Sequence, residues 1–187
     1  MPAEKKVLVL VADGSEEIEV VVTVDVLRRA GLHVTLASVA GSGPVTCSRQ
    51  VVITPDASLE SIKGGLDAYE VLVLPGGGAV PTAFVASELV IGVIKEFAAN
   101  SRLIAAICAG PLALKAAGVG VGGLITSHPS AQKDLEGTYT YSEERVVLGK
   151  GILTSRGPGT SFEFALAIVR HLKDQIHAHE VAAPMVL

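Results

Sequence analysis

Three short, strongly apolar runs constrain the fold of this chain more than any other feature. They span Val7–Ala12, Tyr69–Leu74 and Leu103–Ile107, and turn-forming residues follow each of them. A strand that is apolar along its length is buried on both faces, which is typical of parallel sheets covered by helices. Segments with a helical period, such as Glu88–Ala99, lie between the runs. The alternation predicts an α/β fold, with a doubly wound, mostly parallel sheet and helices on both faces.

The segment Glu16–Ala30 is the most ambiguous of the helical segments. Its valines favour a strand by propensity, but acidic residues fill its first turn, arginines fill its last turn and Gly31 follows. This charge pattern favours a helix, which Asp13 or Ser15 could cap. Other segments are predicted to be a strand at Leu32–Val39, a hairpin arm in Val45–Ile53, paired strands at Arg145–Leu148 and Gly151–Ser155, and a long helix from Thr160 to about His177 with a Thr160–Glu163 capping box.

Length and composition exclude several classes of protein. The chain has 187 residues, of which 49% are hydrophobic, so we expect one domain spanning residues 1–187 with a large core. A net charge of −4 without a Lys/Arg block argues against direct nucleic-acid binding. Two cysteines cannot form a disulfide framework, and neither a secretory signal nor an apolar run of membrane-spanning length stands out. We therefore expect a soluble cytoplasmic protein, whose apolar tail Ala178–Leu187 packs on the domain or on a partner.

Cys108 lies where the strand Leu103–Ile107 turns into a helix-forming segment that begins at Pro111. A side chain at such an elbow is pushed into a crevice, and nearby backbone N–H groups together with the helix dipole favour a thiolate. The alternative is a buried structural cysteine, a common role for a free thiol. Because the other loops at the carboxyl ends of the strands meet at the same edge of the sheet, we favour a reactive role.

A reactive thiol needs a partner that holds or removes its proton. The candidates at the same edge are Glu16, Glu17, Glu19 and His128. Glu16 and Glu17 are more simply explained as a solvated helix start, whereas Glu19 lies among valines, where burial without a purpose is costly. His128 is either a site residue or a loop histidine with local partners, and the remaining histidines are expected at the surface. The spacing of these residues does not match a zinc site, so we expect no metal.

Four segments closely resemble the ThiJ/PfpI superfamily: Ala105–Pro111, Leu74–Gly77, Glu16–Glu19 and Thr154–Ala165. The resemblance extends from about Lys6 to the C-terminus. It implies a flavodoxin-like sandwich, a homodimer, and a location in the cytoplasm and also in the nucleus and mitochondrion. By the same resemblance the reactive cysteine is Cys108.

The resemblance also implies the remaining site residues and the activity. Glu19 is the protonated partner of the cysteine, His128 is the site histidine, and Gly77 and Ala109 are backbone donors of the oxyanion type. The implied activity is cofactor-free conversion of methylglyoxal or glyoxal to a hydroxy acid, or removal of early glyoxal adducts from proteins. The same cysteine is implied to sense oxidative stress by becoming a sulfinate.

Differences between this chain and the motifs of related proteins limit which functions the resemblance implies. The peptidase branch has histidine directly after the cysteine, where this chain has Ala109, and we cannot place the His-x-Glu pair of class I glutamine amidotransferases. Close members carry a further cysteine where this chain has Thr54, so redox roles of that thiol do not transfer. Cys47 resembles a dimer-proximal cysteine of the family, but we favour a passive strand residue as its explanation. Two functions therefore remain, an aldehyde-detoxifying thiol enzyme and a non-catalytic redox sensor or chaperone; an inert Cys108 is the third reading.

Overall fold

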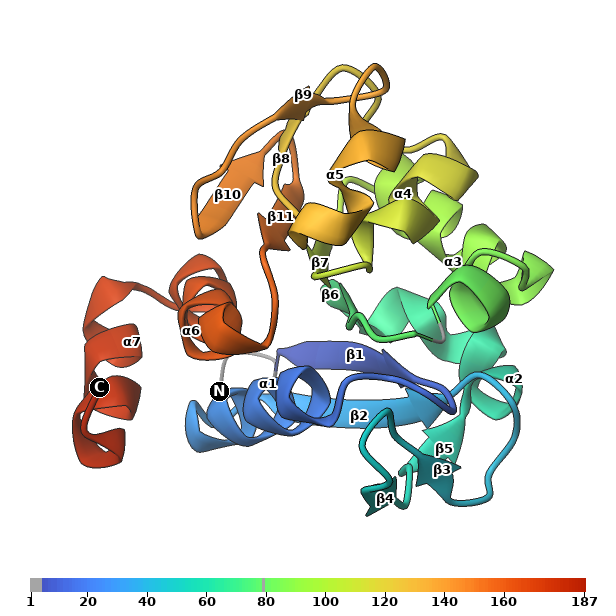
Figure 1. Cartoon of the computed structure of the whole chain (residues 1–187). Helices are drawn as coiled ribbons and strands as arrows, with labels where there is room; N and C mark the ends of the chain where they lie inside the picture. The colour runs from blue at the N-terminus through green and yellow to red at the C-terminus, as the bar shows by residue number, and fades with distance from the viewer. Residues whose placement is uncertain (1–4, 79) are drawn as a thin grey trace.

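The computed structural model describes residues 5–78 and 80–187, which fold around a central sheet (Figure 1). The sheet has the strand order β10–β11–β7–β6–β1–β2–β5, and each pair of neighbours is parallel except β10 and β11. Its strands are β1 (Lys6–Val11), β2 (His33–Ser38), β5 (Ala57–Ser58), β6 (Val71–Leu74), β7 (Leu103–Ile107), β10 (Val146–Gly149) and β11 (Ile152–Ser155). This confirms the predicted mostly parallel, doubly wound α/β fold.

Two small ribbons and a set of helices complete the described part of the chain. The ribbons pair β3 (Val45–Thr46) with β4 (Val52–Ile53), and β8 (Leu124–Ile125) with β9 (Thr140–Tyr141). The helices are α1 (Glu17–Arg29), α2 (Leu59–Ile62), α3 (Glu88–Ala99), α4 (Pro111–Ala117), α5 (Pro129–Leu135), α6 (Ser161–Leu172) and α7 (Gln175–Ala182). Short helical turns are η1 (Lys63–Ala68), η2 (Val80–Phe84), η3 (Pro158–Thr160) and η4 (Ala183–Met185).

The apolar strands divide their side chains between two cores, one on each face of the sheet. Along β1, Leu8 and Leu10 pack with residues of α3 and α4, while Val7 and Val9 pack with residues of α1 and α6. The same alternation holds along β6 and β7. Since successive strand residues point to opposite faces, a strand covered on both sides has to be apolar at every position.

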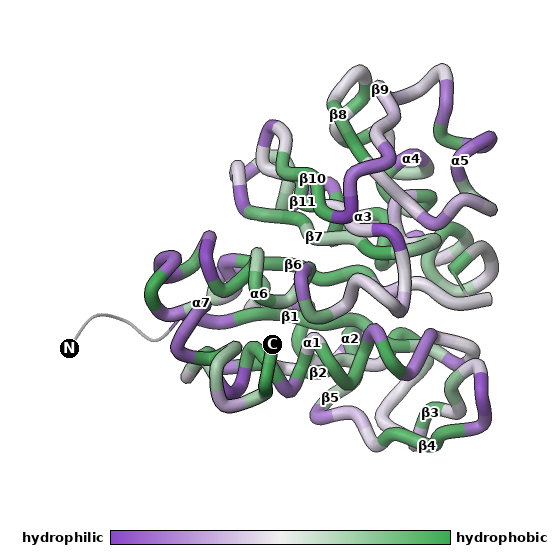
Figure 2. The backbone as a smooth tube through the Cα atoms, turned by 60° about the vertical axis from the view of Figure 1, so that its left-hand side comes forward, coloured by the Kyte–Doolittle hydropathy of each residue, from purple (hydrophilic) through white to green (hydrophobic). Residues whose placement is uncertain are grey.

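Hydrophobic segments run through the centre of the molecule, and β4 is hydrophobic although it lies at the periphery (Figure 2). None of the helices in the described residues is both long and apolar enough to cross a membrane.

The reversal of strand order lies between β1 and β6. The chain first adds β2 on one side of β1, and later adds β6, β7 and β11 on the other side. Ligand sites of such sheets lie beyond the carboxyl ends of the strands at this reversal. The segments that follow β1, β6 and β7 therefore frame the expected site.

One predicted helix end and one predicted helix cap are wrong, for identifiable local reasons. The helix beginning at Ser161 ends at Leu172 rather than near His177, because Lys173 leaves the helical region and Asp174 caps α7 by accepting a hydrogen bond from His177 N at 2.8 Å. Thr160 makes no capping hydrogen bond to α6, since its hydroxyl is bonded within the preceding turn and to Ser155.

The helix α1 is confirmed, but neither predicted residue caps it. The Ser15 hydroxyl accepts from Ala12 N, and the Asp13 carboxylate accepts from Thr46 N. Both side chains instead fix the loop after β1, and the Asp13 contact joins this loop to the β3–β4 ribbon.

Candidate functional site

Cys108 adopts a left-handed backbone conformation, with φ of 63°, directly after β7. Such a conformation costs a residue with a side chain about 1–3 kcal/mol and is concentrated at functional positions. Alternation along β7 would send residue 108 to the α3–α4 face, yet Cys108 packs with the α1–α6 core. The sharp turn thus directs the thiol toward α1, and Cys108 remains partly exposed.

Glycines make room for this turn. A Cβ atom on Gly76 would lie 2.5 Å from Cys108 Cβ and 2.9 Å from Cys108 Sγ, and one on Gly110 would lie 2.4 Å from Leu74 O. Backbone hydrogen bonds hold the cysteine on both sides, because Cys108 N donates to Ser155 O and His128 N donates to Cys108 O, each at 3.0 Å. The thiol is therefore fixed between the ends of β6, β7 and β11.

Glu19 in the first turn of α1 is fully buried beside this thiol. Its Oε2 accepts a hydrogen bond from Gly76 N at 2.6 Å, and its carboxyl group contacts the Cys108 thiol. Burial raises the pKa of Glu19 to about 7, although the hydrogen bonds from Gly76 and Cys108 oppose the rise. A carboxyl group with this pKa can accept and release a proton near neutral pH.

The Cys108 thiol is the other half of this pair. Burial raises the pKa of Cys108 to about 12, the charge of ionised Glu19 adds to the rise, and hydrogen bonds from the backbone N–H groups of Gly77 and Ala109 oppose it. The direction is opposite to that expected from a helix N-terminus alone, because desolvation and the neighbouring carboxylate outweigh the two N–H groups. The pair consequently loses one proton near pH 7 and holds the second far above neutral pH.

The loops that carry these groups are tied together. Gly77 has φ of 107°, and a Cβ atom there would lie 2.4 Å from Gly14 O. Glu16 N donates to Gly76 O at 3.0 Å, and Ser15 forms a bridge to Gly77. Backbone contacts thus join the segments after β1 and β6, and they hold the Gly77 N–H group near the thiol.

His128 lies at the same edge, at the N-terminus of α5. Its Nδ1 is 2.8 Å from the Ser130 hydroxyl and accepts from Ser130 N at 3.2 Å. The other side of the ring lies against Gly157, where a Cβ atom would be 3.3 Å from His128 Cδ2. The ring is therefore held on two sides, while its backbone is bonded to Cys108.

The structure brings together the Cys108 thiol, the Glu19 carboxyl group and the two backbone donors that the resemblance implies, and it joins His128 to Cys108 through the backbone. Glu17 differs from expectation, because it is buried rather than solvated and accepts hydrogen bonds from Ser48 Oγ at 2.7 Å and Arg49 N at 2.6 Å. These bonds fix the turn between β3 and β4 to the start of α1. Glu17 therefore has a structural role at this helix.

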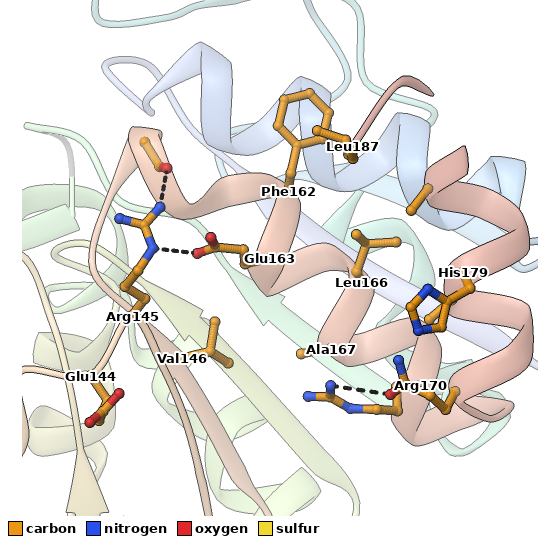
Figure 3. A pocket seen from close by; sticks show the side chains of 14 residues that line it. Glu144, Arg145, Val146, Phe162, Glu163, Leu166, Ala167, Arg170, His179 and Leu187 are labelled. Atoms are coloured by element: carbon orange, nitrogen blue, oxygen red, sulfur yellow. Dashed lines mark hydrogen bonds and ion pairs between the residues drawn. The ribbon is translucent and has the colours of Figure 1, made fainter. Parts of the chain in front are cut away.

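A separate cavity of about 710 Å³ lies between β10, α6 and α7 (Figure 3). Phe162, Leu166 and Leu187 contribute apolar surface to it, and Arg145 Nε is paired with a Glu163 carboxylate oxygen at 2.7 Å on its rim. Its lining contains no cysteine, so this cavity is separate from the turn that carries Cys108. Among the described residues, no group of three or more His, Cys, Asp or Glu side chains is placed to hold a metal ion.

Comparison with known proteins decides the family. The model of the DJ-1/PfpI family matches residues 5–171. The chain belongs to the DJ-1/PfpI family. It is 50% identical over 188 residues to the Parkinson disease protein 7 homolog of Danio rerio, covering 99% of this chain and 98% of the relative. It is 38% identical to the glutathione-independent glyoxalase DJR-1.2 of Caenorhabditis elegans, covering 100% and 99% of the two chains.

Solved structures of the DJ-1/PfpI family agree with this assignment. The crystal structure of Drosophila melanogaster DJ-1beta superposes with a TM-score of 0.95, at 41% identity and with 99% of each chain covered. The crystal structure of the VC2308 protein superposes with a TM-score of 0.92 at 40% identity, covering 99% of this chain and 94% of that one. The flavodoxin-like arrangement is thus that of the family.

Two residues of this DJ-1/PfpI site were missed by sequence reasoning. Gly76 donates a hydrogen bond to Glu19 and leaves room for the Cys108 side chain, but in the sequence it is only one glycine of a run. Ser130 bonds to His128, and the sequence shows there only a serine two positions after the histidine. The first contact depends on where β6 ends in space, and the second depends on how the first turn of α5 begins.

Proposed function

We propose that this protein is a cofactor-independent thiol enzyme that converts small 2-oxoaldehydes such as methylglyoxal to hydroxy acids. The observation that carries the proposal is the contact between the partly exposed Cys108 thiol and the buried Glu19 carboxyl group. A relative named as a glutathione-independent glyoxalase supports the same reaction class.

The first step is attack of Cys108 on the aldehyde carbon. Ionised Glu19 takes the thiol proton as the sulfur–carbon bond forms, and the electrons of the carbonyl bond move to its oxygen. A pKa near 7 suits Glu19 to this exchange at neutral pH. The N–H groups of Gly77 and Ala109, which already bond to the sulfur, stabilise the oxyanion beside it. The oxyanion then takes the proton from Glu19, which yields a neutral hemithioacetal.

The second step is an internal proton transfer. Glu19 removes the hydrogen of the former aldehyde carbon, and the electron pair forms an enediol with the neighbouring carbonyl, whose oxygen is protonated. Return of a proton to that neighbouring carbon, with loss of the proton from the first hydroxyl, gives a thioester. Water then cleaves the thioester to release the hydroxy acid and the Cys108 thiol. Electrons and atoms balance without a cofactor, because the former aldehyde carbon is oxidised by two electrons while the neighbouring carbonyl carbon is reduced by two.

Removal of the nucleophile tests this proposal. We expect Cys108→Ala to lower methylglyoxal turnover by at least about a thousandfold, the scale on which removal of a covalent nucleophile acts. Cys47→Ala is the matched control and is expected to retain turnover. Full turnover by Cys108→Ala, with its fold intact by circular dichroism, contradicts the proposal. The same pair of variants applied to glycated peptides tests whether early glyoxal adducts are also substrates.

The alternative function is a redox sensor, favoured by the partial exposure of Cys108 and its two N–H donors. In this reading the thiol is oxidised to a sulfinate, and Glu19 holds the oxidised group by a hydrogen bond. Intact mass after a peroxide titration separates the two functions. Addition of two oxygens at Cys108 at low peroxide, together with negligible aldehyde turnover, favours the sensor.

We further propose that two copies associate through the face formed by α1 and the β3–β4 ribbon. Ile18, Val21, Val51 and Val52 lie on these elements with exposed fractions of 49%, 50%, 46% and 62%. Apolar exposure of this density is typical of an interface between subunits. Light scattering that gives the mass of one chain at micromolar concentration would overturn this part.

A further inference from the structure

The environment of His128 indicates which of its ring nitrogens carries the proton. Ser130 N lies 3.2 Å from His128 Nδ1 and donates to it as part of the first turn of α5. A backbone N–H group can only donate, so Nδ1 must offer a lone pair. A proton on Nδ1 would place two donors face to face, both in the neutral Nδ1–H form and in the doubly protonated ring.

The Ser130 hydroxyl is compatible with the same assignment, because a hydroxyl can donate as well as accept. It lies 2.8 Å from Nδ1, and with Nδ1 acting as acceptor the hydroxyl is the donor of this bond. Both donors of one residue thus point at a single ring nitrogen. The neutral ring then carries its proton on Nε2, because a neutral imidazole has one donor and one acceptor.

The rest of the ring is positioned by packing. His128 Cδ2 lies against Gly157, and His128 N is bonded to Cys108 O at 3.0 Å. With Nδ1 occupied by Ser130, Nε2 is the ring nitrogen that remains for a bound molecule. A Cβ atom at position 157 would lie only 3.3 Å from His128 Cδ2, so a glycine at this position leaves room for the imidazole ring.

We propose that Ser130 is a positioning residue that holds His128 as the neutral Nε2–H tautomer, so that His128 donates a hydrogen bond to the substrate and is not the base. This inference rests on the proposed function and deepens it. The oxygen that suits a donor there is the second carbonyl oxygen of a 2-oxoaldehyde, which gains charge as the enediol forms. Removal of the carbon-bound proton is then left to Glu19.

The tautomer can be measured without turnover, by long-range proton–nitrogen correlation spectra of protein labelled with ¹⁵N-histidine. The chain has five histidines, and the His128 signals are those that disappear in His128→Gln. We expect protonated Nε2 and unprotonated Nδ1 in the wild-type protein at neutral pH. A protonated Nδ1, in either tautomer or in the charged ring, overturns the inference.

Activity of two histidine variants provides a second readout. The side-chain amide nitrogen of Gln occupies about the place of Nε2 and donates, but it cannot act as a base. We expect His128→Gln to retain at least about ten times the kcat/KM of His128→Ala, since a donor is kept. Equal loss in both variants contradicts the role as donor.

Ser130→Ala tests the positioning residue itself, since it removes the hydroxyl and leaves the backbone N–H group. We expect kcat/KM to fall about fivefold, with a second tautomer of His128 in the spectra. Ser61→Ala is the matched control, because Ser61 is also an exposed serine in a short helix whose hydroxyl makes a local bond, at 2.7 Å to Ser58 O. An unchanged tautomer and an unchanged kcat/KM in Ser130→Ala overturn the assignment to Ser130.

Retained turnover in Cys108→Ala would contradict the proposed function but would not affect the tautomer measured for His128. The failure of the proposed function and the failure of this inference are therefore distinguishable.

Discussion

The two cysteines of this chain lie in buried surroundings that differ in what faces the sulfur. Burial raises the pKa of Cys47 to about 11, and the charges of Glu17, Glu16 and Asp13 add to the rise. Burial likewise raises the pKa of Cys108 to about 12. Removing a thiol from water thus makes both side chains weaker acids, and burial alone does not distinguish them.

The difference lies in donors and in the neighbouring acid. Two backbone N–H groups bond to the Cys108 sulfur, and the carboxyl group beside it has a pKa of about 7. Cys47 faces several carboxylates and is almost fully buried, with 1% of its surface exposed. A reactive thiol in this fold therefore depends on a proton partner and on fixed hydrogen-bond donors, in addition to access from solvent.

After removal of the Cys108 nucleophile itself, the largest effect is expected from crowding the turn around Cys108. In Gly76→Ala the new methyl group would lie 2.5 Å from Cys108 Cβ, so the turn must shift. A displacement of about 1 Å at a reacting group costs about 100-fold in rate, so we expect at least that loss of turnover. Gly78→Ala is the control, because nothing lies within 4 Å of a Cβ there. Equal turnover of the two variants would show that the geometry around Cys108 is not what separates it from Cys47.

The next effect concerns stability and its pH dependence. The raised pKa of Glu19 means that the unfolded chain ionises this group from about pH 4.5 upward, while the folded protein does so only near pH 7. Wild-type stability therefore falls between these pH values as pH rises, by about 3 kcal/mol relative to Glu19→Gln, which has no such group. Urea unfolding of both proteins from pH 4 to 8 measures the difference. Parallel curves would mean that Glu19 is not held neutral by burial.

The smallest effect is expected at the other cysteine. Cys47 is packed in the ribbon, where its backbone bonds to Val51 O at 2.8 Å, and its sulfur has no assigned chemistry. We expect Cys47→Ala to cost about 1 kcal/mol of stability through lost packing and to change methylglyoxal turnover by less than about twofold. A loss of turnover comparable to that of Cys108→Ala would break the distinction between the two thiols.

Much of this arrangement could be predicted from local sequence. The apolar runs specify strands buried on both faces, and the order of turns after them places the segments following Ala12, Leu74 and Ile107 at one edge. Glu19 could be singled out because a carboxyl group among valines is costly to bury. These signals lie within short stretches of sequence. They predict the structure correctly because strands buried on both faces of the sheet have little freedom to shift in register.

The remaining features depend on contacts between distant segments. The hydrogen bond from Gly76 N to Glu19 joins residues 57 positions apart, and no sequence spacing predicts it. The predicted cap at Thr160 failed because Ser155 and Gly157 compete for its hydroxyl, and the long helix failed because Asp174 begins a new one. Similarly, Glu17 is buried because the ribbon that contains Ser48 folds onto it.

The pH dependence of Cys108 alkylation tests the central claim, that Cys108 and Glu19 exchange a proton as a pair. Cys47→Ala provides the background, since the chain has two cysteines and only Cys108 then remains. With Glu19 present we expect reactivity toward a neutral alkylating reagent to rise with a midpoint near pH 7, and Glu19→Gln to move that midpoint to higher pH. The same midpoint in both proteins, near the value of about 8.5 for a free cysteine, would contradict the account.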